Sequence, residues 1–212
     1  MKREEKRRLV AQEAAKLLYF KLAEKYNQAK EKASKSLNSK ALPSNLEVAF
    51  ELDRIANEVE GVSRQKLIIR LRKEALKIMK DLEGFNPRLI GSVWRGTARN
   101  SSDIDIVIFV ERVEPVLKVL KDKFKDLEIA YPSKTDKGVT QRFVHISVRL
   151  PSGCYVEIVV RKIEEINEKN RCEIFGDFIT GLTVKQLQKI LDTAPLQKFV
   201  PKKNRRKLSF NK

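Results

Sequence analysis

The sequence has little cysteine and histidine and no long apolar run. Of its 212 residues, two are cysteine and one is histidine, so a zinc site built from these residues is close to excluded. Two cysteines also fit a reducing compartment. No stretch approaches the roughly 18 uncharged apolar residues that cross a membrane, and the charged N-terminus lacks the apolar core of a signal peptide. We therefore expect a cytoplasmic protein without a membrane partner.

Acidic residues are scarce relative to basic ones. The chain carries 45 Lys and Arg against 28 Asp and Glu, a net charge of +17, which favours a polyanionic partner. Seven basic residues and no acid fall within residues 195–212, which leaves +10 on residues 1–194. We interpret 195–212 as a basic tail that neutralises phosphates, and a solvated terminus is the alternative. Its candidate nucleic-acid-binding residues are Lys202, Lys203, Arg205, Arg206 and Lys207.

Residues 1–84 form a predicted N-terminal helical region. Apolar residues at spacings of three and four predict one long amphipathic helix over about 5–35. Ser44, with Glu47 three residues later, fits a capping box that opens a second helix. We expect Gly61 to end that helix and Ser63 to cap a third one that runs to about residue 82.

Short β-rich runs follow and define a predicted domain over residues 85–194. The expected strands are 88–90, 104–110, 142–150 and 155–160, and the last two are joined by a turn at 151–153. Helices are predicted over about 115–125 and 183–192. The fold class is therefore α+β, with a small mixed sheet flanked by helices and preceded by the helical region.

A glycine turn follows the first predicted strand. Gly91 lets the backbone approach a ligand closely, and the hydroxyl of Ser92 can donate to a phosphate oxygen. A helix that begins just afterwards would aim its free amides at the same anion. Arg95 adds positive charge, so the sequence predicts a nucleotide-binding turn at Gly91, Ser92 and Arg95.

Two aspartates lie on the next predicted strand. Asp103 and Asp105 are separated by one apolar residue, so their side chains point to the same face of the strand. Two carboxylates on one face repel each other unless a cation lies between them. Hard oxygen ligands suit Mg²⁺, which commonly completes its shell with substrate phosphates and water. Asp103 and Asp105 are therefore candidate catalytic residues and metal ligands.

A third acid is expected on a neighbouring strand. Glu157 is the only acid within the run 155–160, which is otherwise apolar, although a solvent-facing Glu on a hairpin is the alternative. Three carboxylates around two Mg²⁺ ions can activate an attacking hydroxyl and stabilise a leaving pyrophosphate. This chemistry is nucleotidyl transfer from a nucleoside triphosphate. The only histidine, His145, is read as a hydrogen-bonded residue of the sheet, with an approach to the nucleotide as the alternative.

The run from Gly91 to Thr97, followed by Asp103, Ile104 and Asp105, resembles the signature of the DNA polymerase beta nucleotidyltransferase superfamily. It is especially similar to the catalytic head of archaeal-type CCA-adding enzymes, which build the 3′ end of tRNA, over about residues 86–161. The resemblance implies that Asp103 and Asp105 bind the metals and that Ser92 and Arg95 hold the triphosphate. It also implies that a later carboxylate, here Glu157, completes the site.

The short remainder after residue 160 cannot hold the large tRNA-gripping domains of that family, so a minimal stand-alone nucleotidyltransferase is expected. The predicted activity is Mg²⁺-dependent transfer of a nucleoside monophosphate from ATP or CTP to the 3′-hydroxyl of an RNA, with tRNA as a candidate. Two alternatives stay open. One is an RNA-binding module with a degenerate site, and the other is a nucleotidyltransferase that acts on a protein partner.

Overall fold

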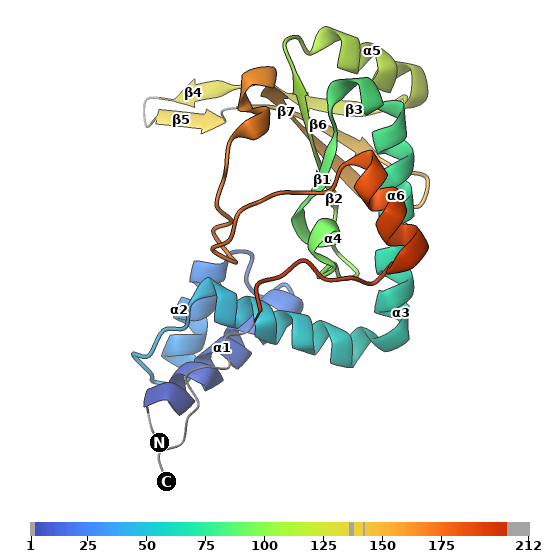
Figure 1. Cartoon of the computed structure of the whole chain (residues 1–212). Helices are drawn as coiled ribbons and strands as arrows, with labels where there is room; N and C mark the ends of the chain where they lie inside the picture. Colours follow the sequence, from blue (N-terminus) through green and yellow to red (C-terminus); the bar gives the residue numbers. More distant parts are fainter. Residues whose placement is uncertain (1–2, 136–137, 142, 203–212) are drawn as a thin grey trace.

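A mixed five-stranded sheet, with helices packed against it, forms the larger part of the molecule (Figure 1). The computed structural model describes residues 3–135, 138–141 and 143–202. Within these ranges it describes all side chains except those of residues 133–142. Helices come first and strands follow, which confirms the expected α+β class. In spatial order the strands are β1 (Arg88–Ile90), β2 (Ile104–Val110), β7 (Tyr155–Lys162), β6 (Val144–Arg149) and β3 (Leu127–Ala130).

The pairing of the strands makes the sheet mixed. β2 and β7 run parallel, whereas the other three pairs are antiparallel. The predicted ranges of β1 and β2 are confirmed residue for residue, while β6 begins two residues later than predicted and β7 ends two residues later. Strand β3 is not predicted from the sequence, nor is the hairpin of β4 (Ser133–Thr135) and β5 (Gly138–Gln141), and each of these strands is only three or four residues long.

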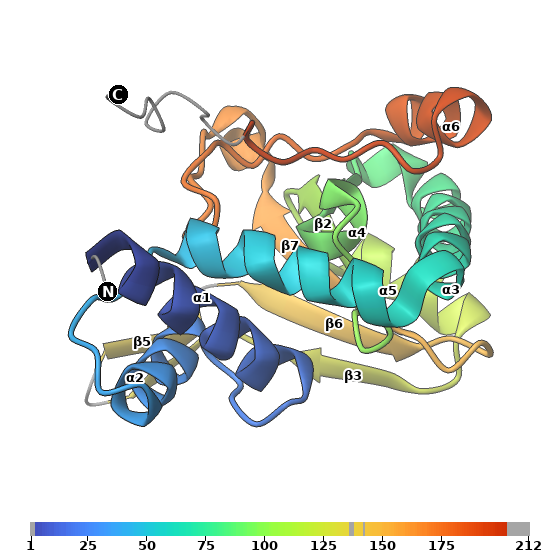
Figure 2. The ribbon, with the colours of Figure 1, turned by 90° about the horizontal axis from the view of Figure 1, so that it is seen from below.

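The two faces of β2 have different surroundings. Ile104, Ile106 and Ile108 are fully buried in one hydrophobic cluster with residues of α3 (Asn45–Asp81), α5 (Glu114–Lys123) and α6 (Val184–Thr193). Figure 2 shows α3 and α6 side by side next to the sheet. Because side chains alternate along a strand, Asp105 points to the opposite face. We call this opposite side the carboxylate face.

The N-terminal helices have their own small core. The single helix predicted over 5–35 is wrong, because the chain forms α1 (Arg3–Tyr19) and α2 (Tyr26–Ser36). The break falls at the turn where Lys21 adopts a left-handed φ of 57°. Alanines dominate the contact between the two helices, and Val48 and Ile55 of α3 complete this second cluster. We call α1, α2 and residues 45–60 the N-terminal unit.

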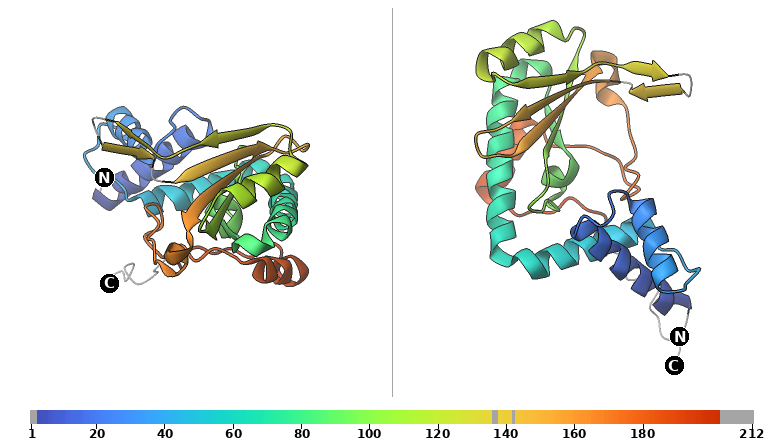
Figure 3. Two further views of the ribbon diagram at one scale, coloured as in Figure 1. Left: turned by 90° about the horizontal axis from the view of Figure 1, so that it is seen from above. Right: turned by 180° about the vertical axis from the view of Figure 1, so that it is seen from behind.

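The helix α3 connects the N-terminal unit to the sheet. Ser44 and Glu47 form the predicted capping box. Gly61 interrupts the helix as predicted, with φ 51° and ψ −130°, and the two segments continue as one kinked helix. Figure 3 shows this bend. The first segment packs on α1, whereas the second shares the core of the sheet. The second segment therefore packs as part of the sheet domain, although the predicted boundary after residue 84 assigns it to the N-terminal region.

The first part of the expected basic tail packs on the body of the molecule. The Phe199 ring stacks on Trp94 with 6.4 Å between centroids, and its amide donates to the carbonyl of Arg95 at 3.0 Å. Of the predicted nucleic-acid-binding residues, Lys202 is described, whereas Lys203, Arg205, Arg206 and Lys207 lie outside the described residues. In the described part of the chain, none of the helices has the length and apolarity to cross a membrane.

Candidate active site

Three carboxylates occupy neighbouring positions on the parallel strands β2 and β7. Asp105 lies directly opposite Glu157 in the strand register, and Asp103 immediately precedes β2. Paired residues on adjacent strands project to the same face. The row that contains Asp105 and Glu157 continues to Ile90 of β1 and Ser147 of β6. The structure therefore brings the predicted acid pair and the predicted third acid together on the carboxylate face.

The glycine turn lies against the second aspartate. β1 ends at Ile90, which pairs with Asp105, and the five-residue helix α4 (Gly91–Arg95) begins at the next residue. Gly91 has φ +68°, and a Cβ at this position would lie 2.7 Å from Cγ of Asp105 and still closer to its Oδ2. A side chain here would displace the carboxylate. Gly91 thus serves Asp105 directly, and Ser92 follows it at the start of the same helix.

The carboxylates repel one another strongly. Burial, followed by the charges of Glu157 and Asp103, raises the pKa of Asp105 to about 7. Burial and Glu157 also raise the pKa of Asp103, while the ammonium of Lys21 opposes this rise. The negative forms of both aspartates are therefore costly, and a bound cation would relieve this cost.

The third acid is held by the only histidine of the chain. Nδ1 of His145 lies 2.5 Å from Oε1 of Glu157. His145 pairs with Val159 and therefore lies one row from Glu157 on the same face of the sheet. His145 is therefore hydrogen-bonded within the sheet, as predicted, and its partner is a predicted site residue. His145 lies two residues before Ser147 in β6, and Ser147 pairs with Glu157. This spacing is the signal from which the contact could have been found.

The donor set fits a hard divalent cation. Asp103, Asp105 and Glu157 supply only carboxylate oxygens, the ligand type that Mg²⁺ prefers. In the described residues, no group of three His, Cys, Asp or Glu side chains is close enough together to enclose a metal ion. His145 contacts Oε1 of Glu157, which would leave Oε2 to coordinate a metal. These three residues would hold the metal, and their carboxylates would have to draw closer together around it.

Arg95 does not join this group. Its side chain is only 4% exposed, and its guanidinium donates to both carboxylate oxygens of Asp177 and to the carbonyl of Phe199. The guanidinium also lies over the rings of Trp94 and Phe175, at 4.5 and 4.2 Å from their centroids. These contacts replace the predicted phosphate-binding role of Arg95 with a structural one, because its donors hold the C-terminal part of the chain.

Two further buried arginines, both on α3, hold the backbone that carries the site. Arg72 is fully buried and donates to the carbonyls of Val93, Trp94, Pro195 and Gln197 at 2.7–3.1 Å. It thereby ties α4 to the C-terminal segment. Its burial lowers the pKa of the guanidinium to about 10, so the group remains a cation at neutral pH.

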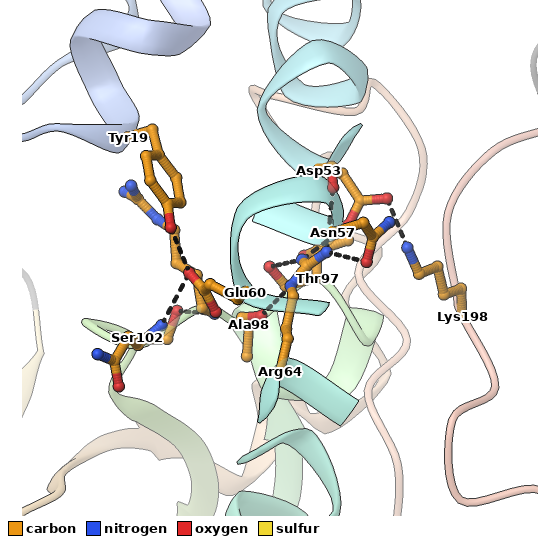
Figure 4. A network of polar contacts seen from close by, with 11 residues as sticks. Tyr19, Asp53, Asn57, Glu60, Arg64, Thr97, Ala98, Ser102 and Lys198 are labelled. Atoms are coloured by element: carbon orange, nitrogen blue, oxygen red, sulfur yellow. Dashed lines mark hydrogen bonds and ion pairs between the residues drawn. The ribbon is translucent and has the colours of Figure 1, made fainter. Parts of the chain in front are cut away.

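Arg64 holds the loop of residues 96–102 that leads into β2. It donates to the carbonyls of Thr97 and Ala98 at 2.8 Å, and to Asp53 and Asn57 of the N-terminal unit (Figure 4). Lys198 binds the other oxygen of Asp53 at 2.5 Å. Neither arginine is among the residues predicted from the sequence, although a spacing of four places Arg64 and Arg72 on the same helix face as buried Ile68.

A separate cavity lies away from the carboxylates. It has a volume of about 790 Å³ and is lined by the second segment of α3, the end of α5 and the turn between β6 and β7. Its charged lining mixes acids such as Glu74 and Asp81 with bases such as Lys77 and Lys123. Because this lining mixes acids and bases, it offers no group of residues suited to one reaction. The carboxylate face is therefore the better candidate for an active site.

The fold is thus an α+β fold whose mixed sheet presents three carboxylates beside a glycine turn. The family described as "Domain of unknown function (DUF4269)" matches residues 72–171 of this chain. The matched range begins in the second segment of α3 and ends after β7. It contains Gly91, Ser92, Asp103, Asp105 and Glu157. No curated protein matches the chain significantly.

Proposed function

We propose that the protein is a Mg²⁺-dependent nucleotidyltransferase that adds a nucleoside monophosphate from ATP or CTP to the 3′-hydroxyl of an RNA. The observation that carries this proposal is the alignment of Asp105 with Glu157 on parallel strands, with Asp103 beside them and Gly91 packed against Asp105. The sequence between Gly91 and Asp105 resembles that of nucleotidyltransferases, and this resemblance supports the same hypothesis. The two free thiols, Cys154 and Cys172, favour a cytoplasmic location.

Each residue contributes to positioning or to charge. Asp103, Asp105 and Glu157 would hold the metal ions, and Ser92 would donate to a phosphate oxygen of the triphosphate. Bound Mg²⁺ supplies electrostatic stabilisation of the phosphates and lowers the pKa of the attacking hydroxyl. Gly91 keeps Asp105 in place, and His145 keeps Glu157 on the carboxylate face.

The reaction forms one bond and breaks one bond. The 3′-oxygen of the acceptor attacks the α-phosphorus of the triphosphate, and the bond from that phosphorus to the bridging oxygen breaks. The bonding electrons leave with pyrophosphate, and the hydroxyl proton passes to solvent. Charge stabilisation and alignment of the two substrates are the main contributions that a protein makes to such a transfer.

The net charge of +17 supports RNA as the acceptor. A protein that neutralises several phosphates gains affinity through the release of counterions. The excess positive charge does not lie at the site itself, whose candidate ligands are acidic. Transfer RNA is the favoured acceptor because of the resemblance to CCA-adding enzymes.

The test is incubation with each labelled nucleoside triphosphate, Mg²⁺ and total RNA, followed by identification of the labelled species. Asp103→Ala and Asp105→Ala should abolish incorporation while the circular dichroism spectrum stays unchanged. Asp122→Ala, an exposed aspartate of α5, is the matched control and should keep full activity.

The outcomes separate this proposal from its alternatives. Incorporation that survives in both aspartate variants contradicts the proposal. Label on a polypeptide would identify a protein-modifying enzyme. Salt-sensitive binding of RNA without transfer of any of the triphosphates would identify a binding module.

A further inference from the structure

A small cavity lies where the N-terminal unit meets the loop that leads to the carboxylates. It has a volume of about 350 Å³ and is lined by residues 19–21, Glu60 and residues 99–101. Ser101 is two residues before Asp103 along the chain. The cavity is therefore connected to the proposed metal ligands through this loop, and its other wall belongs to the N-terminal unit.

We propose that this cavity binds the 3′-terminal nucleotide of the acceptor RNA, with the base on Phe20 and a phosphate on Lys21. The inference rests on the proposed function and extends it, because it assigns a substrate contact to the N-terminal unit. That unit lies outside the range matched by the family of unknown function.

An exposed aromatic ring is available for the base. Phe20 is 61% exposed at the end of α1. Its ring is supported from one side by Tyr19, with 5.2 Å between centroids and an interplanar angle of 88°. The Tyr19 hydroxyl in turn donates to Glu60 at 3.1 Å. Aromatic side chains held in this way are the usual platforms on which single-stranded bases stack.

A free cation lies beside that ring. Lys21 is exposed, and among the described residues its ammonium takes part in no ion pair or hydrogen bond. The left-handed turn at Lys21, closed by hydrogen bonds from Leu22 and Ala23 to Leu17, fixes where the side chain starts. A phosphate between Lys21 and the metals would neutralise both.

The remaining wall is held in place by its own contacts. Arg99 donates to the carbonyl of Leu18 at 2.9 Å, and the Asn100 amide approaches Glu60 at 3.5 Å. Figure 4 shows Tyr19 and Glu60 at this junction. Glu60 is the acid of the cavity, and its carboxylate can accept from the exocyclic amine of a base. The wall therefore offers an acceptor to a nucleotide.

The acceptor, rather than the triphosphate, fits this side of the site. Gly91 and Ser92 border Asp105, whereas the cavity borders the loop before Asp103. In an in-line displacement, the attacking and leaving oxygens lie on opposite sides of the phosphorus. If the triphosphate lies at the glycine turn, the attacking 3′-oxygen arrives from the other side, where the cavity lies.

The experiment pairs two variants with two oligonucleotides. Phe20→Ala and Lys21→Ala are compared with Leu22→Ala, whose side chain is equally exposed in the same turn but does not line the cavity. The probes are a short labelled RNA with a free 3′ end and the same RNA without its terminal base. Binding is measured by fluorescence anisotropy in Mg²⁺ without triphosphate, and KM is measured for the RNA and for the triphosphate.

Wild-type protein should bind the intact RNA about 5- to 150-fold more tightly than the RNA without its terminal base, which is the range for one stacked base. Phe20→Ala should lose this discrimination and should raise KM for the RNA but not for the triphosphate. Lys21→Ala should weaken the binding of both RNAs, and Leu22→Ala should behave as wild type.

Two results would overturn the inference. One is binding by Phe20→Ala and Lys21→Ala that equals binding by Leu22→Ala, and the other is a rise in KM for the triphosphate alone. If wild-type protein distinguishes the two RNAs through Phe20 but transfers no nucleotide, the proposed function fails and the 3′-end site stands. The two failures are therefore distinguishable.

Discussion

Nδ1 of His145 lies 2.5 Å from Oε1 of Glu157, so a histidine of β6 holds a carboxylate of β7 beside the aspartates of β2. The contact is diagonal in the strand register, because His145 pairs with Val159 and Glu157 pairs with Ser147. The shorter side chain of an aspartate would reach less far toward this histidine. The use of Glu157 as the third acid and the position of His145 therefore explain each other.

Replacement of His145 should weaken metal use without unfolding the protein. Partners that orient a metal ligand typically contribute 10- to 100-fold in affinity or activity, so His145→Ala should raise the Mg²⁺ concentration for half-maximal activity by about that factor. His145→Gln keeps an amide donor and should restore part of the loss. Titration of nucleotide incorporation with Mg²⁺ measures both effects, and identical curves for all three proteins would contradict the role of His145.

Gly91 should tolerate substitution far less than another glycine with positive φ. Gly91→Ala places a Cβ against the Asp105 carboxylate, whereas a Cβ at Gly153, with φ +83°, meets nothing within 4 Å. Both variants have a left-handed strain of roughly 1–2 kcal/mol. Only Gly91→Ala should also abolish nucleotide incorporation. Thermal unfolding and activity of the two variants decide this, and equal activities would contradict the proposed packing of Asp105 on Gly91.

The Mg²⁺-free protein should lose stability as pH rises through about 7. The pKa of Asp105 is raised from its ordinary 3.8 to about 7 in the folded state. The folded protein therefore binds this proton more tightly than the unfolded chain does, and the resulting stability is fully present below about pH 3.8 and is lost progressively as pH rises to about 7. Asp105→Asn should accordingly raise the melting temperature at pH 8 by several degrees, and by less at pH 5.

The control for this measurement is Asp122→Asn, which removes an exposed carboxylate of α5. Its melting temperature should follow that of wild type at both pH values. Added Mg²⁺ should stabilise wild type at pH 8 more than it stabilises Asp105→Asn, because the cation offsets the same repulsion. A stability difference that does not depend on pH would exclude the carboxylate repulsion as its cause.

Arg72 should contribute much more to stability than an exposed arginine of the same helix. Arg72→Met leaves buried carbonyls without donors, and we expect a loss of roughly 3 kcal/mol or more in the free energy of unfolding. Arg54 binds Glu51 and Glu58 at the surface, so Arg54→Met should cost less than about 1 kcal/mol. Urea denaturation measures both values, and similar midpoints for the two variants would contradict the structural role of Arg72.

Removal of residues 203–212 should weaken RNA binding without affecting the chemical step. The segment carries five of the seven basic residues of the predicted tail. Its deletion should therefore reduce the slope of log affinity against log salt by up to about 3 to 4. Turnover at saturating RNA should stay unchanged, and a scrambled segment of equal charge should restore affinity. Normal affinity with lost turnover would contradict this division of roles.

Local sequence signals predicted the parts of the fold that depend on neighbouring residues. The ranges of β1 and β2, the capping box at Ser44 and the helix predicted over about 183–192, which is α6, all follow from short patterns, and the structure confirms them. The position of Glu157 on a strand next to Asp105 was also predicted, and β2 and β7 are indeed paired. The catalytic role of these residues stays a prediction.

Features that depend on distant partners could not be predicted. Arg95 has the sequence position of a phosphate ligand, yet Asp177 and Phe199, far along the chain, bind its guanidinium. In the sequence, Arg72 is one more charged residue of an amphipathic helix. Its acceptors, the carbonyls of Pro195 and Gln197, lie far along the chain and are brought to it only by the fold. The break between α1 and α2 was missed because apolar periodicity continues through the turn at residues 20–25.

The dependence of Arg72 and Arg95 on residues 195–199 has a consequence for protein synthesis. Chains are made from the N-terminus and fold progressively as they emerge. Until residues 195–199 leave the ribosome, two guanidinium groups that are buried in the finished protein lack the carbonyl partners that this segment supplies. We therefore expect α4 and the glycine turn to reach their final positions only after residues 195–199 have emerged.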